Sequence, residues 1–257
     1  MKSNKTTILA LALCASALAF AQASHTAEDF KGSWAISKSE QAAQVHLALM
    51  HRMDGGKSHH ESDWPTSAFQ GVDFTVRGKR DVQFSISRDA GRFNCEGYLD
   101  DGEGAGIFHF VRDGKYSKSM SALGFDGIDE EKQFAMAVHD ITLDFARSMK
   151  DEGVSGLDTN MLIAFRIHGV TPQFIGEIRA AGLAATSSDK LVAFRIHGVT
   201  PEMVRDVRKA NLDPSEDQLI AMRIHGVTPA FIADLKARGL KNLTVDQLVG
   251  LRIHGID

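Results

Sequence analysis

The sequence predicts an α+β protein in which an N-terminal antiparallel β-meander or β-sandwich precedes a C-terminal array of two-helix repeats. Apolar and polar residues alternate with period two through much of the first half, as they do in half-buried strands. In the second half the phrase Arg-Ile-His-Gly-Val-Thr-Pro occurs three times, at intervals of 29 and 28 residues. We expect a signal peptide over residues 1–23, a β-rich domain over 24–113 and a helical repeat domain over 114–257.

The N-terminal segment is typical of a secretory signal. Two lysines near the start precede an apolar run over residues 8–20, and small residues at positions 21 and 23 suit signal peptidase. The run is shorter than the ~20 residues that span a bilayer as a helix. A lipoprotein signal ending at Cys14 is the weaker alternative, because the bulky Leu13 precedes that cysteine. We expect cleavage before Ser24, a periplasmic or secreted mature protein, and no transmembrane segment after cleavage.

The charge balance and the cysteine count restrict the function of the mature chain. The 257 residues include 29 Lys+Arg and 33 Asp+Glu, a formal net charge of −4, and loss of two lysines with the signal changes it to −6. An acidic protein is poorly suited to neutralising the phosphates of a nucleic acid. Cleavage leaves Cys95 as the lone cysteine, which excludes a disulfide framework. Its position in an alternating run predicts a buried thiol.

Strands are expected where the alternation is clear, over residues 45–49, 72–76, 82–86, 93–99 and 106–110. Asp/Gly turns between the later runs favour an antiparallel meander with one face on a core. The stretch Gly102-Glu103-Gly104-Ala105-Gly106 resembles a fragment of a nucleotide-binding loop. Such a loop needs a helix after it, whereas the next element has the pattern of a strand. We interpret it as a hairpin turn.

A polar stretch over residues 46–63 contains His46, His51, His59 and His60, together with several carboxylates. These are residue types that bind zinc, but no His-Glu-x-x-His spacing occurs in the chain. We interpret the stretch as a solvated loop with no metal. A metal-dependent hydrolase built on the His46–Asp63 segment is the alternative.

Each repeat is predicted to contain two short helices. The first begins at a capping residue ten positions before the repeated histidine and ends at the glycine that follows this histidine. The second begins at the Thr-Pro of the phrase, where Thr caps the helix and Pro fits its first turn. Helices of about ten residues are marginal alone, so the units should stack as an α-solenoid or compact bundle. The N-terminal caps of the first helices are Asp129, Asp158, Ser187, Ser215 and Thr244.

The charged residues of the phrase form the candidate binding stripe, which consists of Arg166, His168, Arg195, His197, Arg223, His225, Arg252 and His254. Two interpretations stay open. Basic groups near a helix C-terminus stabilise it by roughly 0.3–1 kcal/mol, which is a structural role. The same residues would also line one edge of a stacked array and bind an envelope protein or an anionic ligand. A shared metal site is disfavoured, because equivalent residues on stacked helices lie about 8–10 Å apart.

The phrase is also reminiscent of helix-hairpin-helix modules that bind nucleic acid through a Gly-rich hairpin. A threonine stands where those hairpins usually have a second glycine. Export and the negative net charge argue further against this alternative.

The His-Gly-Val-Thr-Pro repeats, with the Arg88–Gly91 turn and the Glu96-Gly97 and Gly104–Phe110 segments before them, resemble a group of bacterial exported or membrane proteins. In that group a β-rich module precedes such repeats. The repeats are also similar to C-terminal extensions of membrane metallopeptidases of the β-lactam-sensor type. This resemblance covers essentially the whole mature chain and implies an accessory or sensor module on the envelope side. The peptidase zinc motif is absent, so no catalytic residue is carried over. We therefore predict a non-catalytic binding module without a cofactor.

Overall fold

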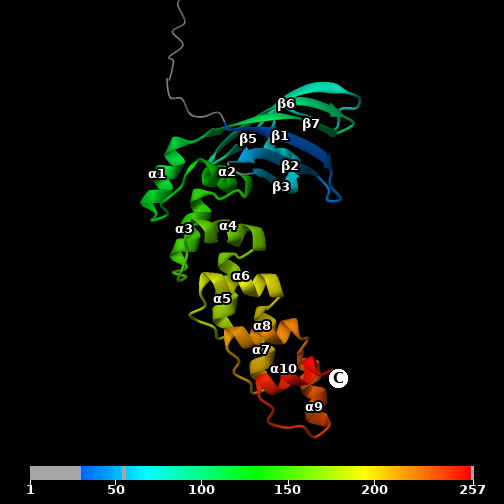
Figure 1. Cartoon of the computed structure of the whole chain (residues 1–257), viewed down its shortest axis with the longest axis vertical. Helices are drawn as coiled ribbons and strands as arrows, with labels where there is room; N and C mark the ends of the chain where they lie inside the picture. Colours follow the sequence, from blue (N-terminus) through cyan, green and yellow to red (C-terminus); the bar gives the residue numbers. More distant parts are fainter. Residues whose placement is uncertain (1–29, 54–55, 256–257) are drawn as a thin grey trace, which may run out of the picture.

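The computed structural model describes residues 30–53 and 56–255, so the predicted signal peptide lies outside the described residues. Within them a seven-stranded antiparallel sheet is followed by ten α-helices, which confirms the predicted α+β class (Figure 1). None of the described helices is long and apolar enough to cross a membrane.

The strands are β1 (Phe30–Lys38), β2 (Gln44–Met53), β3 (Gly56–Pro65), β4 (Phe69–Gln70), β5 (Arg80–Arg88), β6 (Gly91–Asp100) and β7 (Glu103–Arg112). They form one sheet in the order β3-β2-β1-β7-β6-β5-β4. The sheet is a pair of meanders joined where β1 pairs with β7, and the described residues contain no second sheet that would make a sandwich.

The sheet is strongly curled, because β3 and β4 are its two edges and yet are joined by only three residues, the 3₁₀ turn Thr66–Ala68. Such a link reaches about 14 Å, whereas six strand spacings in a flat sheet amount to about 29 Å. The edges therefore approach each other, and the rings of Trp64 and Phe69 lie 6.5 Å apart across the gap.

The concave face of this sheet forms the first part of the core, with Trp34 at its centre. The indole Nε1 of Trp34 donates to the carbonyls of Glu96 and Ile107, at 3.2 and 3.1 Å. A Cβ on Gly106 would lie 2.0 Å from the Glu96 carbonyl and 2.7 Å from the Trp34 ring, so a side chain is not tolerated there. The predicted hairpin is present, but only Gly102 of the Gly-rich stretch lies in its turn. β6 turns into β7 through Asp101 and Gly102, both with positive φ, and Glu103 already pairs as the first residue of β7.

Two sequence predictions for this region are wrong. The polar stretch His46–Asp63, predicted as a loop, lies instead on β2 and on the edge strand β3, which pairs with β2 along its length. An edge strand has solvent on one side, and polar residues on both faces are tolerated there. Residues 72–76 were expected to form a strand but form a loop instead, in which Asp73 accepts from the backbone N–H of Thr75 and Phe74 packs on Phe69.

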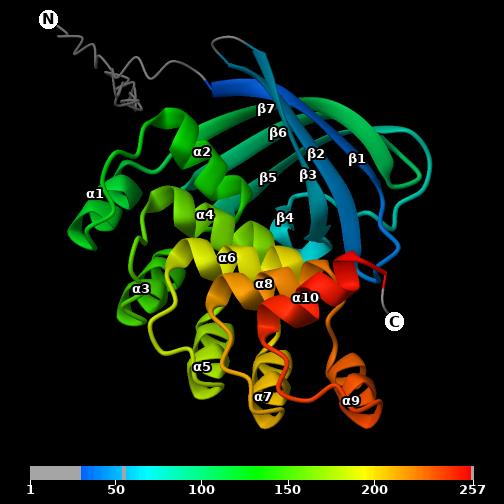
Figure 2. The same cartoon turned by 60° about the horizontal axis from the view of Figure 1, so that its bottom comes forward.

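The helices are α1 (Gly114–Ala122), α2 (Glu130–Val138), α3 (Leu143–Asp151), α4 (Thr159–His168), α5 (Pro172–Ala180), α6 (Ser188–His197), α7 (Pro201–Lys209), α8 (Glu216–Ile224), α9 (Pro229–Ala237) and α10 (Val245–Ile253). Figure 2 shows α4, α6, α8 and α10 side by side as one layer, with α5, α7 and α9 below it. We call the first set the even layer. The predicted array of two-helix repeats is confirmed.

The predicted caps account for the helix ends. The side chains of Asp129, Asp158, Ser215 and Thr244 accept from backbone N–H groups in the first turn, and Ser187 is the exception. Each first helix ends in a left-handed residue, which is glycine in the four repeats and Asp140 in the worn copy.

The sheet and the array share one continuous core, which runs from Trp34 to Leu219 on α8. Phe134 of α2 joins them, because its ring stacks on Phe30 and Phe108 inside the concave face. A second, smaller cluster of buried apolar residues lies among α7, α8, α9 and α10, at the C-terminal end of the array.

Candidate binding surfaces

The four arginines of the predicted stripe connect consecutive repeats. Arg195 Nε donates to the carbonyl of His168, the last residue of α4, at 3.1 Å. The same bond recurs from Arg223 to His197 and from Arg252 to Gly226, and Arg166 Nη2 reaches the Asp140 carbonyl. Each guanidinium therefore caps the first helix of the preceding unit rather than its own helix.

Three of these guanidinium groups also lie over a phenylalanine of the preceding second helix. Arg195 lies 4.9 Å from the Phe174 ring centroid, and Arg166 and Arg252 lie similarly over Phe145 and Phe231. The C-terminal glycine makes room for the guanidinium: a Cβ on Gly169 would lie 2.8 Å from Arg195 Nη2. The charged half of the predicted stripe is thus occupied in contacts within the array.

The histidines of the stripe have fewer contacts. His197, His225 and His254 are exposed at the C-terminal end of the even layer, and His168 is half-buried. The worn copy differs, because His139 faces the sheet, with its ring 5.7 Å from that of His60 on β3. The array thus begins with a histidine that packs on the sheet.

An exposed apolar row on the even layer was missed by the sequence reasoning. Ile167, Ile196, Ile224 and Ile253 follow the repeated arginines, and each is 54–56% exposed. The sequence signal was present, since this isoleucine recurs in all four copies although it is out of phase with buried positions such as Leu162 and Phe165.

The pairing of β2 with β3 separates the four histidines considered for metal binding. His46 and His59 lie on the outer face, where His46 Nδ1 is 3.0 Å from Asp63 and Glu61 is 3.8 and 3.5 Å from the two rings. His51 and His60 lie on the inner face. In the part of the chain that the structure describes, no three His, Cys, Asp or Glu residues are placed to hold a metal ion.

The inner histidines form a cluster at the junction of sheet and array. His51 is buried, with Nε2 3.0 Å from Glu131 of α2, and its ring stacks parallel to that of His60 at 6.1 Å. Burial lowers the pKa of His60, and burial together with His60 lowers the pKa of His139 to about 4. The folded junction therefore favours the neutral forms of His60 and His139.

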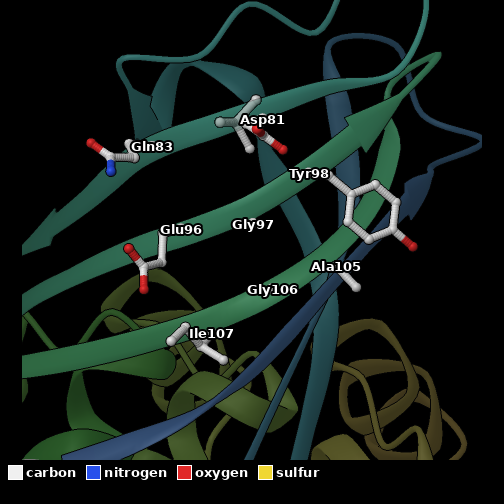
Figure 3. A pocket seen from close by; sticks show the side chains of 9 residues that line it. Asp81, Gln83, Glu96, Gly97, Tyr98, Ala105, Gly106 and Ile107 are labelled. Carbon is white, nitrogen blue, oxygen red and sulfur yellow. The ribbon is translucent and has the colours of Figure 1, made fainter.

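The outer face of the sheet carries an open hollow over Gly97 and Gly106, with a volume of about 950 Å³. Figure 3 shows Gln83 and Glu96 near one end and Tyr98 at the other. Its lining includes carboxylates and a phenol but no histidine, cysteine or serine.

Cys95 is a buried free thiol on the inner face of β6, as the alternation predicted. Burial raises its pKa to about 12, which makes it a poor nucleophile.

Comparison of the chain with protein-family models, curated proteins and solved structures gives no match.

Proposed function

We propose that this protein is a non-catalytic binding module of the bacterial envelope that acts through protein–protein contacts on the even layer. The row of four equally exposed isoleucines carries this proposal. Contiguous exposed apolar residues on a soluble protein are typical of interaction sites, and in a stacked array the same position recurs on every unit.

The structure favours a protein partner over the anionic ligand that the sequence left open. The guanidinium groups of the stripe donate to carbonyls within the array, and three of them also stack on phenylalanines. They are less available to a ligand than free surface arginines would be.

The hydrolase alternative receives less support for a geometric reason. The histidines of the His46–Asp63 segment point to opposite faces of the sheet, which separates His46 and His59 from His51 and His60. His46 and His51 lie on the same strand, β2, but on opposite faces, so a site assembled from all four would need both β2 and β3 to rearrange.

The test is capture of partners from bacterial envelope extract by the mature protein and by the double variant Ile196→Ser, Ile224→Ser. We expect the variant to lose the captured protein while its circular dichroism and unfolding midpoint stay unchanged, since both side chains are exposed. Val111→Ser is the matched control, because Val111 is 56% exposed but lies on β7. Equal capture by all three proteins would refute the proposal.

A further inference from the structure

The exposed face of every even helix has the same order of side chains from its N-terminus to its C-terminus. On α6 the order is Asp189, Val192, Ala193, Ile196 and His197, which the helical repeat of 3.6 residues brings to one face. The aligned residues on α8 are Asp217, Ile220, Ala221, Ile224 and His225, and those on α10 are Asp246, Val249, Gly250, Ile253 and His254. On α4 they are Asn160, Ile163, Ala164, Ile167 and His168.

Side by side, the four helices turn these positions into rows that cross the layer (Figure 2). One row is small and consists of Ala164, Ala193, Ala221 and Gly250. The exposed isoleucine row lies three residues further along each helix, and the half-buried row that directly precedes the small row packs on the core. A row of small residues beside a row of exposed branched ones leaves a step in the surface that side chains of a partner can contact.

The occupant of such a surface must satisfy its own backbone. The backbone groups of the even helices are bonded within the helices, so an extended peptide would find few donors or acceptors on this apolar face. A bound helix has no such requirement, because its N–H and C=O groups pair internally. Packed helices lie about 8–10 Å apart, and seven residues of a helix rise about 10.5 Å. One heptad therefore matches one step across the layer, and four helices match about 20 residues.

Opposite charges border the apolar rows. Asp189, Asp217 and Asp246 lie at the N-terminal edge of the layer, where Lys190 pairs with Asp217 and Gln218 donates to Asp246. Arg195 and its equivalents lie at the C-terminal edge, where each guanidinium group donates to a backbone carbonyl, which is a neutral partner. The even layer therefore has one acidic edge and one basic edge, which together fix the orientation of a charged partner.

We propose that the even layer binds an amphipathic helix of about 20 residues from a partner protein. Apolar side chains one heptad apart contact the small row, a basic edge faces the aspartates and an acidic edge faces the arginines. This inference rests on the proposed function and specifies the chemistry of the partner.

The probe is a synthetic 21-residue helical peptide with leucine at heptad positions, lysine along one edge and glutamate along the other. We expect saturable binding to the mature protein by fluorescence anisotropy. Ala221→Glu, which places a charge in the small row, should weaken binding at least ten-fold. Ala233→Glu is the matched control, because Ala233 is exposed on α9 outside the layer and this variant should bind as the wild type does.

The direction of the bound peptide tests the charge argument separately. A nitroxide at the peptide N-terminus should broaden amide resonances of either α4 or α10 but not both, and exchanging the lysine and glutamate edges should move the broadening to the other end. No saturable binding, equal binding by both Ala→Glu variants, or a direction that does not reverse would each overturn the inference. If the peptide does not bind but envelope capture still requires Ile196 and Ile224, the proposed function holds and the partner is not a helix of this kind.

Discussion

Replacement of a repeat arginine by glutamine should destabilise the array, because the contacts that it removes connect one unit to the next. Arg195→Gln removes the bond from Nε to the His168 carbonyl and the stacking on Phe174. Arg223→Gln removes only the equivalent bond to His197, because the position of that phenylalanine is occupied by Met203 in the next unit. The two variants therefore differ by one cation–π contact.

The magnitudes follow from those contacts. A hydrogen bond from a charged group contributes ~1.5–3 kcal/mol, and the exposure of both arginines places it near the lower end. A cation–π contact at an exposed site adds about 0.5–1 kcal/mol. We expect losses of about 2–2.5 kcal/mol for Arg195→Gln and about 1.5 kcal/mol for Arg223→Gln. In the Phe174→Leu background the two losses should become equal, as a double-mutant cycle would show.

The assay is urea unfolding of the mature protein followed by far-UV circular dichroism. Arg205→Gln is the matched control, since Arg205 makes only a surface pair with Glu202 on α7 and should lose under about 0.5 kcal/mol. If both repeat variants were as stable as this control, the inter-repeat bonds would contribute nothing. The arginines would then be available to an anionic ligand, and the binding-stripe interpretation would regain its support.

Three further predictions concern the junction, the sheet and export. Burial and a neighbouring imidazole lower the folded pKa of His139 to about 4, so the unfolded chain binds its proton first as pH drops from about 6.5 to 4. The shift corresponds to ~3 kcal/mol, and because the ring is partly exposed to solvent we expect stability to fall by about 1–2 kcal/mol. In His139→Gln the free energy of urea unfolding should depend less on pH over this range, and an unchanged pH dependence would contradict the prediction. Gly106→Ala should lower the free energy of unfolding by more than about 2 kcal/mol, because the new Cβ would clash with the Glu96 carbonyl. Gly176→Ala on α5 meets no neighbouring atom and should raise it by about 0.5–1 kcal/mol. Thermal melts that rank the two variants the other way would refute the packing argument. Intact-mass spectrometry of the protein from the periplasm should give an N-terminus at Ser24, and an intact initiator methionine would contradict the signal assignment.

Features that depend on a few neighbouring residues were predicted from the sequence. Helix ends are of this kind, because a cap such as Asp158 bonds a backbone N–H three residues away and Gly169 sets its own φ. The hairpin at Asp101 was predicted for the same reason. Alternation also identified the buried side of β6, including Cys95.

Features that depend on distant partners were not predicted. Trp34 bonds carbonyls 62 and 73 residues away, and nothing near it in the sequence indicates either one. The strand β3 was missed because polar residues occupy both of its faces. The exposed isoleucines are out of phase with the buried positions of their helices, but the sequence does not show which neighbouring units cover a helix face, so they were missed.

The position of β1 inside the sheet, between β2 and β7, affects the order in which the chain folds. β1 is the first strand among the described residues, yet Phe30 pairs with Phe110, eighty positions later. The sheet therefore cannot close until β7 is available, and closing so long a loop is entropically costly and slow. The helical units bond mainly to their immediate neighbours and can add one at a time. We expect the sheet to limit the folding rate and Phe134 to anchor the first helices once the sheet has formed, with the even layer completed last at α10.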